Sequence, residues 1–384
     1  MKESLRQSYD VIIVGTGPAG ATLAYELSSQ GIAVLLLDKE KLPRYKTCAG
    51  GLTIKAAELL GFDISPVVEG AINGMRFSYK FGHQGTRLCD RPLVYTVMRE
   101  KFDLFLVEKA QNAGAAVLDE QKVEQVKTEA SQVTVCTQNH TFTAKVIVGA
   151  DGTNSTIARE LGLMRDTPFN LGLEGEIYVD EEVLSRWQNL IGIELGSVPP
   201  GYAWIFPKKN HLSIGIVGPR HSARRMRSYF NRLLESQNLG NYRVNALRAA
   251  LLPVRKKAMP ITADRALLVG DAAGLTDILT GEGIYYAIKS ARLAAPVITR
   301  FLKGDIVDLQ DYEKAIDREL MPELRATRNL ARLSTWLPYL RFRLLRDNGW
   351  VWRTLCRIVR GEQTYASLRT RFRPLQFLFD QLSR

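Results

Sequence analysis

The 384-residue sequence is poor in the features that would place it at once in a metal, disulfide or membrane-spanning class. Its 4 cysteines form no C-x-x-C pair, so we expect no zinc site, iron–sulfur cluster or redox-active disulfide, and no bound metal. Apolar runs never reach the roughly 18 residues of a membrane-spanning helix, and the polar start does not resemble a signal peptide. These absences predict a cytoplasmic protein.

What the chain does have is a large apolar fraction and an uneven charge. Hydrophobic residues make up 46% of the sequence and charged residues 24%, which suits a folded protein with a sizeable core, and the length suits two packed domains. The net charge is +12. Residues 318–384 hold 14 Arg, no Lys and 5 acidic residues, so +9 of this surplus lies in the C-terminal tail and needs a local explanation.

The first 40 residues predict a nucleotide-binding βαβ unit. A β-branched run at 11–14 opens into the pattern Gly15-x-Gly17-x-x-Gly20, a helix follows, and a second apolar strand ends at Asp38. Gly15 permits a tight turn, Gly17 lets the backbone approach a pyrophosphate, and Gly20 lets the helix pack on the strand. Asp38 can accept hydrogen bonds from an adenosine ribose. The unit predicts dinucleotide binding, with NAD and FAD both open.

Later segments help to choose between these cofactors. Residues 146–151 and 266–271 are apolar strands that each end in glycine and aspartate, and a Gly-Glu-Gly turn at 281–283 precedes a predicted helix over 284–298. Several strand ends that offer glycine and an acid suit a long, extended ligand that is touched at several points. Each segment taken singly has an alternative interpretation, an ordinary turn with a capping aspartate.

Together these segments resemble the flavoprotein superfamily typified by p-hydroxybenzoate hydroxylase over most of residues 8–300. The resemblance implies FAD in an extended pose, with Asp38 at the adenosine ribose, Arg99 near the pyrophosphate and Asp271 at the ribityl or pyrophosphate region. A second G-x-G-x-x-G is missing, so a nicotinamide donor, NADPH or NADH, would visit only transiently. The cofactor-binding residues implied are Gly15, Gly17, Ala19, Gly20, Asp38, Lys39, Arg99, Asp151, Gly270, Asp271, Gly281 and Gly283.

A cysteine loop and an aromatic segment narrow the resemblance. Residues 48–51 read Cys-Ala-Gly-Gly, and residues 202–207 read Tyr-Ala-Trp-Ile-Phe-Pro, followed by Gly215. These segments resemble the geranylgeranyl reductase family, which reduces isoprenoid double bonds and shares a C-x-G-G loop and a Y-x-W-x-F-P stretch before G-x-G. Only the first glycine of that last motif is present. The substrate-binding residues implied are Cys48, Gly50, Gly51, Tyr202, Trp204, Phe206, Pro207 and Gly215.

The aromatic segment predicts an apolar surface without any family. Residues two apart in a strand share a face, so Tyr202, Trp204 and Phe206 form one stripe. The stripe suits core packing beneath a helix, but its place in the middle region, away from the nucleotide segments, favours the lining of a polyprenyl site. Cys48 taken alone is a small hydrophobe, yet the small residues beside it would let a flat ring approach.

The chemistry adds one requirement. An isolated alkene is a poor hydride acceptor, so its reduction needs a proton donor on one side, reduced flavin on the other and exclusion of water. Cys48 and Tyr202 are the candidate catalytic residues, and the choice between them stays open.

The tail combines arginine with aromatic side chains. Trp336, Trp350 and Trp352 fall within seventeen residues, among leucines and arginines, which is the composition of an interfacial segment that faces anionic lipid. A helical cap with a solvated arginine face is the alternative. Nucleic acid is not expected as a partner, because no recognition motif accompanies the charge. We expect peripheral membrane contact through residues 318–384.

These inferences combine into an α/β flavoprotein with a Rossmann-like FAD-binding domain, an interleaved antiparallel-sheet substrate domain and a C-terminal helical extension. The FAD-binding domain is expected over 1–70, 90–165 and 258–304, the substrate domain over 71–89 and 166–257, and the basic helical region over 305–384. The expected activity is NADPH-dependent saturation of geranylgeranyl double bonds in a diphosphate, a prenylated chlorophyll precursor or a prenyl lipid. The rivals are an FAD-dependent monooxygenase or hydroxylase on the same fold and a non-catalytic flavin- or prenyl-binding protein.

Overall fold

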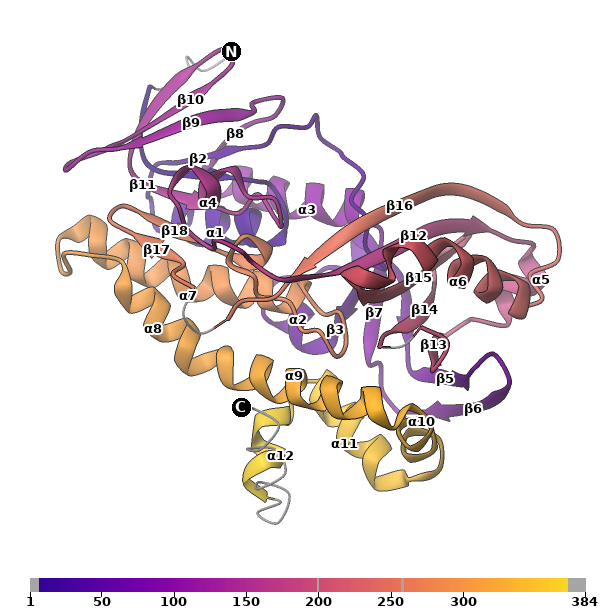
Figure 1. The fold of residues 1–384 in the computed structure, drawn as a ribbon. Coiled ribbons are helices and arrows are strands. Elements are labelled where there is room, and N and C mark those ends of the chain that lie inside the picture. Colours follow the sequence, from indigo (N-terminus) through magenta and orange to yellow (C-terminus); the bar gives the residue numbers. More distant parts are fainter. Residues whose placement is uncertain (1–6, 199, 257–258, 372–384) are drawn as a thin grey trace.

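The computed structural model describes residues 7–198, 200–256 and 259–371, with the backbone alone for residues 334, 336 and 369–371 (Figure 1). Two units built on sheets lie side by side, and a helical extension runs beneath both. Residues 372–384 of the predicted membrane-facing tail and the side chain of Trp336 lie outside the described part of the chain.

The first unit is built on an eight-stranded sheet whose central strands are parallel. Its order is β17-β18-β11-β1-β2-β8, and β10 pairs with both β11 and β9. Residues 11–14 of β1 are buried on both faces, as the continuous β-branched run predicts for a parallel sheet. The strands are β1 (Ser8–Val14), β2 (Val34–Leu37), β8 (Ala116–Leu118), β9 (Val123–Thr128), β10 (Val133–Thr137), β11 (Thr141–Gly149), β17 (Thr262–Ala263) and β18 (Ala266–Leu268).

Three long helices pack together on this sheet, namely α1 (Pro18–Ser28), α3 (Arg99–Asn112) and α7 (Ile284–Lys303). Helix α1 begins directly after the glycine turn, because Pro18 occupies the first helical position, where its missing N–H costs nothing. Helix α7 ends where Gly304 adopts a left-handed conformation. The short helices of this unit are α2 (Ile54–Glu58), α4 (Thr156–Glu160), η1 (Ser65–Val67) and η3 (Gly270–Ala273).

The second unit is built on a seven-stranded sheet with the order β16-β12-β15-β14-β13-β5-β6. Its pairs are antiparallel except for β13 and β5, which run parallel. Helix α6 (Ala223–Ser236) buries one face of this sheet. The short helices of this unit are α5 (Glu181–Ser185) and η2 (Arg220–Ser222), which directly precedes α6. The strands are β5 (Gly74–Tyr79), β6 (His83–Leu88), β12 (Phe169–Tyr178), β13 (Leu190–Leu195), β14 (Tyr202–Pro207), β15 (Leu212–Pro219) and β16 (Arg243–Pro253).

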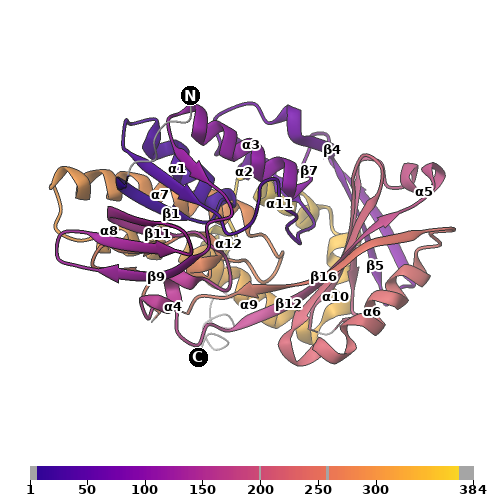
Figure 2. The same ribbon diagram turned by 90° about the horizontal axis from the view of Figure 1, so that it is seen from above.

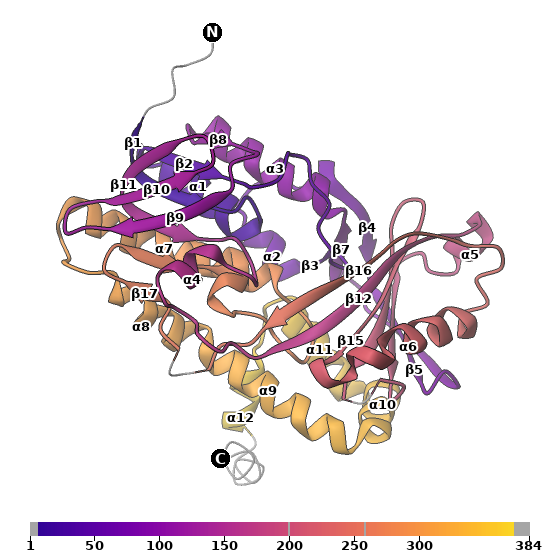
Figure 3. The same ribbon diagram turned by 45° about the horizontal axis from the view of Figure 1, so that its top comes forward.

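A three-stranded sheet of order β3-β7-β4 lies between the two units (Figures 2 and 3). Its strands are β3 (Gly51–Thr53), β4 (Val68–Ile72) and β7 (Val94–Val97). Strand β4 crosses the domain boundary that the sequence places after residue 70, so the polypeptide passes between the units inside a sheet rather than in a loop.

Helices α8 (Gln310–Glu319), α9 (Met321–Trp336), α10 (Pro338–Asp347), α11 (Gly349–Val359) and α12 (Tyr365–Arg371) form the extension. Arg255, fully buried, anchors α8 by ion pairs with Glu313 at 2.6 Å and Asp317 at 2.7 Å. Further along, Trp352 of α11 packs edge-on against Phe77 of β5, with ring centroids 6.1 Å apart. Within the described residues, no helix has both the length and the apolar character needed to cross a bilayer. The predicted α/β architecture with a helical extension is confirmed.

Candidate functional site

A cavity of about 1460 Å³ lies where the two units meet the C-terminal helices. Its walls come from the strand ends of the first sheet, the loop that follows β2, one face of the second sheet and helices α9 to α12. Ligand pockets usually measure roughly 300–1,000 Å³, so this cavity has room for a cofactor and a substrate together.

The glycine turn at the end of β1 forms one end of the cavity. Gly15 adopts a φ of +108°, and a Cβ there would stand 2.3 Å from the carbonyl oxygen of Ala150. A Cβ at Gly20 would stand 1.9 Å from the carbonyl oxygen of Gly15, because helix and strand touch there. At Gly17, by contrast, the nearest atom to such a Cβ is 3.9 Å away, in the side chain of Arg44. The backbone is thus open where a pyrophosphate would approach the helix N-terminus, and the turn fits a dinucleotide.

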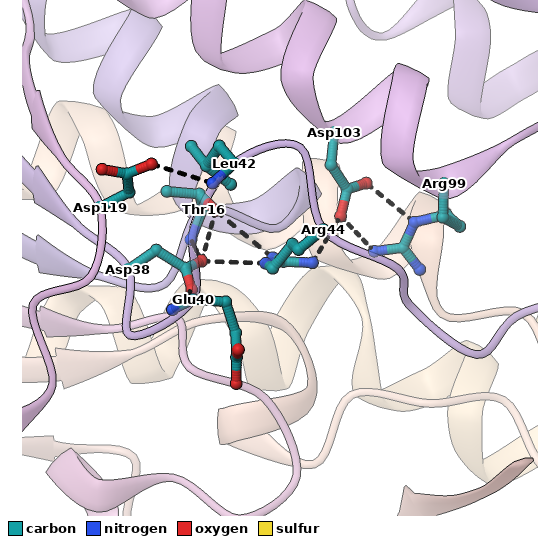
Figure 4. Close-up of polar contacts among 8 residues, drawn as sticks. All are labelled: Thr16, Asp38, Glu40, Leu42, Arg44, Arg99, Asp103 and Asp119. Carbon is teal, nitrogen blue, oxygen red and sulfur yellow. Dashed lines mark hydrogen bonds and ion pairs between the residues drawn. The ribbon is translucent and has the colours of Figure 1, made fainter.

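A chain of alternating charges runs from Asp38 at the end of β2 to Arg99 at the start of α3 (Figure 4). Arg44 Nε lies 3.1 Å from Asp38 Oδ2, and Arg44 Nη1 lies 3.3 Å from Asp103 Oδ2. Arg99 binds the same Asp103 through two nitrogens, at 2.8 and 2.9 Å. Although burial acts to raise it, Arg44 and the hydroxyl of Thr16 hold the pKa of Asp38 below its usual value. Asp38 therefore stays ionised and able to accept hydrogen bonds.

The two later aspartates have different surroundings. Asp151 caps helix α4, because its Oδ2 accepts hydrogen bonds from the backbone N–H of Thr156 at 2.6 Å and of Ile157 at 3.4 Å. This is the alternative that the sequence left open for such a residue. Asp271 accepts a hydrogen bond from the Thr276 hydroxyl at 2.9 Å. Both aspartates line the cavity.

The aromatic stripe on β14 faces the cavity. Tyr202, Trp204 and Phe206 all line it, while Ala203 and Ile205, on the opposite face, pack beneath α6. The Tyr202 hydroxyl donates a hydrogen bond to the carbonyl oxygen of Thr280, in the turn that precedes Gly281. Burial raises the pKa of Tyr202 well above its usual value, so this phenol is a weak acid in the folded protein.

Trp204 owes its position to a missing side chain on the neighbouring strand. Gly215 of β15 lies directly opposite Trp204, and a Cβ there would stand 2.1 Å from the indole Cζ2. The indole therefore lies across Gly215, toward β12. Its Nε1–H is buried without a hydrogen-bond partner. An unpaired donor in a cavity wall is costly unless a ligand or water meets it.

The cysteine loop is fixed to the second unit by one lysine. Lys208 is buried, and its Nζ donates hydrogen bonds to the carbonyl oxygens of Ala49 and Val97, both at 2.7 Å. A Cβ at Gly50 would stand 2.0 Å from that same Val97 oxygen. Cys48 itself lines the cavity, with its Sγ 3.4 Å from the backbone nitrogen of Gly50. Burial lowers the pKa of the Lys208 ammonium.

The cavity gathers most of the residues predicted from sequence and leaves a few outside its walls. The residues that line it are Gly15, Gly17, Ala19, Asp38, Lys39, Cys48, Gly51, Arg99, Asp151, Tyr202, Trp204, Phe206, Asp271, Gly281 and Gly283. The predicted residues outside its walls are Gly20, Gly50, Pro207, Gly215 and Gly270. The four glycines among these allow close packing of backbone or of a neighbouring side chain behind the wall.

Sequence reasoning missed a buried carboxylate pair on β12. Glu174 is 1% exposed and Glu176 is 6% exposed. Glu174 lines the cavity, and its Oε1 accepts a hydrogen bond from the Ser213 hydroxyl at 2.5 Å. Glu176 Oε2 lies 2.7 Å from Nε2 of His211, a residue that is itself 3% exposed. The available signal was two glutamates, two positions apart, within an apolar strand of ten residues.

The C-terminal helices supply the apolar end of the cavity. Leu337, Leu340, Leu344 and Trp350 line it and are also 40% or more exposed, so the cavity reaches the surface among them. Arg341 lies in the same wall. The arginine-rich tail is thus part of the site and not only a separate cover.

Comparison with known proteins places this geometry in a family. A family model described as an FAD binding domain matches residues 8–315. An uncharacterized protein of Methanosarcina barkeri is 34% identical over 83% of this chain and 82% of its own length. Digeranylgeranylglycerophospholipid reductase 2 of Methanothermobacter thermautotrophicus is 31% identical over 79% of this chain and 82% of its own length.

A solved structure agrees with the sequence relatives. The geranylgeranyl bacteriochlorophyll reductase-like protein of Thermoplasma acidophilum superposes with a TM-score of 0.80 at 25% identity, covering 93% of this chain and 92% of that one. The similarity therefore extends through both sheets and into the C-terminal helices.

Proposed function

Since the chain belongs to the geranylgeranyl reductase family of FAD-dependent oxidoreductases, we propose that it saturates carbon–carbon double bonds of a geranylgeranyl group, using electrons that NADPH or NADH passes to FAD. The observation that carries the proposal is the single cavity that joins the dinucleotide turn at Gly15 to the aromatic stripe at Tyr202. A polyprenyl chain laid on that stripe would end beside the cofactor.

The residues of the first unit fit FAD. The open backbone at Gly17 would receive the pyrophosphate, ionised Asp38 the adenosine ribose, and Asp271 the ribityl region, while Gly281 and Gly283 would let the ring approach the backbone. Bound FAD would supply the hydride, which the side chains of this protein have no means to provide.

The second unit would bind the substrate and exclude water from it. Tyr202, Trp204 and Phe206 offer π faces to an apolar chain and to the positive charge that develops on an alkene during reduction. We assign Cys48 and Tyr202 to contact with the reacting part of the substrate. Because the Tyr202 hydroxyl already donates to the Thr280 carbonyl, its contribution would be to hold the turn and the alkene in register.

The decisive experiment is anaerobic incubation of the purified holoenzyme with NADPH and three candidate substrates: geranylgeranyl diphosphate, a geranylgeranylated chlorophyll precursor and a geranylgeranyl ether lipid. The expected product is heavier by two hydrogens for each bond reduced. Oxygen uptake in air without such a gain would instead support a hydroxylase. Bound flavin that neither nicotinamide reduces would support a non-catalytic binding protein.

One pair of variants tests the cysteine loop. Cys48→Ala should retain FAD and suppress turnover, because the side chain lines the cavity. Cys136→Ala, on β10 and outside the cavity walls, is the matched control and should retain both. Full activity of Cys48→Ala would contradict the catalytic role of Cys48.

We further propose that residues 318–384 dock on an anionic membrane surface from which the prenyl chain enters. Leu340 and Leu344 are exposed at the cavity mouth, among arginines that would meet lipid phosphates. Sedimentation with phosphatidylglycerol vesicles should fall for Leu340→Glu and Leu344→Glu but not for Val307→Glu, which is 92% exposed away from the cavity. Equal sedimentation of all three would refute the docking proposal.

A further inference from the structure

The reduction of an alkene needs a proton as well as a hydride, and one of the two predicted donors, Tyr202, is poorly suited to supply it. The Tyr202 hydroxyl donates to a backbone carbonyl, and burial raises its pKa far above neutrality. The structure offers a third acid in the cavity wall.

Glu174 stands on the same face of the second sheet as the aromatic stripe. In the register of the sheet, Glu174 of β12 lies opposite Gly215 of β15, which lies opposite Trp204 of β14. Residues directly opposite each other in antiparallel strands point to the same face. Because Gly215 has no side chain, nothing on β15 separates the carboxylate from the indole, and both line the cavity.

One carboxylate oxygen of Glu174 remains available. Oε1 accepts the hydrogen bond from Ser213, but Oε2 is buried without a hydrogen-bond partner. Ser213 and the backbone N–H of Cys48 favour the ionised form, but a buried carboxylate with so few donors is costly, and burial outweighs them in favour of a protonated O–H. Burial raises the pKa of Glu174 to about 7, and the adjacent charge of Glu176 acts in the same direction. The acid therefore holds its proton near neutral pH.

Polar side chains lie between Glu174 and the surface. Glu176 is two residues along β12 on the same face, and its Oε2 lies 2.7 Å from Nε2 of His211. His211 Nδ1 lies 2.7 Å from Oδ1 of Asn210, whose residue is exposed. The Glu176–His211 pair lies at ion-pair distance without forming a hydrogen bond. Asn210, His211 and Glu176 thus form a row of polar side chains between solvent and the strand that carries the buried acid.

We propose that Glu174 is the acid that protonates the substrate double bond, and that Glu176 and His211 return a proton to it from the surface. The proposal rests on the proposed reductase function. In the step, the O–H bond of Glu174 breaks as a C–H bond forms at one alkene carbon, and the hydride that bound reduced FAD would supply completes the other carbon. That hydride would carry the two electrons that the alkene gains, and Glu174 is left as a carboxylate until a solvent proton arrives.

The new carboxylate would not be left without compensation. Arg248 lies opposite Glu174 on β16, and the charge of the buried Lys208 favours the ionised form. The groups that face Glu174 from the elements packed around it are Glu176 on β12, Ser213 on β15, Lys208 before β15, Arg248 on β16, and Tyr45 and the backbone N–H of Cys48 in the loop after β2.

The test uses Glu174→Gln, which keeps the shape but cannot donate an acidic proton. Glu194→Gln is the matched control. Like Glu174, Glu194 is a buried carboxylate that accepts hydrogen bonds from serine, in its case from Ser78 and Ser197. It lies on the same face of the sheet as Ala203, beneath α6 and away from the cavity. The holoenzymes are reduced anaerobically and then mixed with the prenyl substrate. Glu174→Gln should slow reoxidation by roughly 100-fold to 10,000-fold, the usual range for loss of a general acid, while reduction by NADPH stays unchanged.

Two readouts separate a proton donor from a merely structural residue. Wild-type reoxidation should fall as pH rises through about 7, where Glu174 ionises, whereas the slow Glu174→Gln rate should lack this limb. In infrared difference spectra of the protein without substrate, a carboxylic acid band should titrate in the same range in the wild type and Glu194→Gln and be absent from Glu174→Gln. Glu174→Asp keeps an acid and should restore part of the rate with its pH dependence.

The outcomes are distinguishable. Glu174→Gln that reoxidises at the wild-type rate, or keeps the alkaline limb, would overturn the assignment of Glu174 and leave the reductase function intact. A wild-type enzyme that none of the prenyl substrates reoxidises would overturn the reductase function itself.

Discussion

Replacement of Gly215 by alanine tests the shape of the cavity wall at one atom. The new Cβ would stand 2.1 Å from Cζ2 and 2.5 Å from Cε2 of the Trp204 indole, where ordinary contacts lie at 3.4 Å or more. The indole must withdraw by more than an ångström. It cannot move into the sheet, so it would swing into the cavity, toward the surface that we assign to the prenyl chain.

Two opposing terms set the size of the effect on stability. Overpacking in a core costs about 1–3 kcal/mol, and here the cavity gives the ring somewhere to go, which favours the lower part of that range. Alanine in a strand interior recovers roughly 0.5–1 kcal/mol relative to glycine. The free energy of unfolding should therefore fall by about 1 kcal/mol. Turnover should suffer more, with kcat/KM at least about tenfold lower, because a group of methylene size now obstructs an apolar pocket.

The assay compares Gly215→Ala with Gly172→Ala. Gly172 lies on β12 and lines the same cavity, but a Cβ there would meet its nearest neighbour, Leu252 Cδ1, at an ordinary 3.4 Å. Urea unfolding and flavin absorbance should show that both variants fold and bind FAD, and steady-state kinetics with the prenyl substrate should separate them. If Gly215→Ala is as active as Gly172→Ala, the indole does not lie across residue 215 and the cavity wall is not arranged as described.

Three further perturbations probe other parts of the structure. Gly15→Ala should yield protein without flavin absorbance, because its Cβ would stand 2.3 Å from the backbone oxygen of Ala150. Its control is Gly31→Ala, where a Cβ meets no atom within 4 Å. This control should keep FAD, and its free energy of unfolding should fall by only about 1–2 kcal/mol because of the positive φ. Arg255→Met, which leaves two carboxylates of α8 unpaired, should lower the free energy of unfolding by about 3 kcal/mol in denaturant titrations, and no change would mean that α8 is held by other contacts. The pKa of Glu174 is raised from 4.5 to about 7 in the folded state, so between these pH values the folded protein binds one proton that the unfolded chain has lost. As pH rises through that window, the wild type should lose about 3 kcal/mol of unfolding free energy relative to Glu174→Gln. Parallel pH profiles of the two proteins would contradict the shift.

The dinucleotide end of the site could be predicted from sequence because its constraints are local. Within this turn Gly15 needs its positive φ of +108° and Gly20 touches the carbonyl of Gly15, and the strand, turn, helix and acid follow one another within 40 residues. Because these constraints act within a short stretch of chain, they appear in the sequence as one continuous motif. The same reasoning was less complete for Asp151, because the sequence pattern is the same whether the acid meets a ligand or binds the first N–H groups of a helix; here it binds those of α4 and also lines the cavity.

The domain organisation could be predicted only in outline, since it depends on long-range pairing. Strand β5 joins β13 in parallel across more than a hundred residues, and no local pattern specifies that partner. The same holds for Arg44. It lies in the loop after β2 and bridges Asp38 to Asp103 of α3, a contact that only the packing of that helix on the first sheet creates.

The sequence did not reveal the carboxylate pair Glu174 and Glu176, which includes the residue that we propose as the proton donor. The alternation along β12 puts Glu174 and Glu176 on one face, which from sequence alone is most simply the solvent face of an antiparallel strand. Register reverses this inference, because pairing through β15, the one strand between β12 and β14, places Glu174 on the face of the aromatic stripe. Two strand spacings separate Glu174 from Trp204, about 10 Å between backbones, and the indole shortens that gap by lying across Gly215. An apolar chain packed on the indole would then lie beside the acid, so the same glycine that admits the aromatic ring would also bring the proposed substrate within reach of the proposed proton donor.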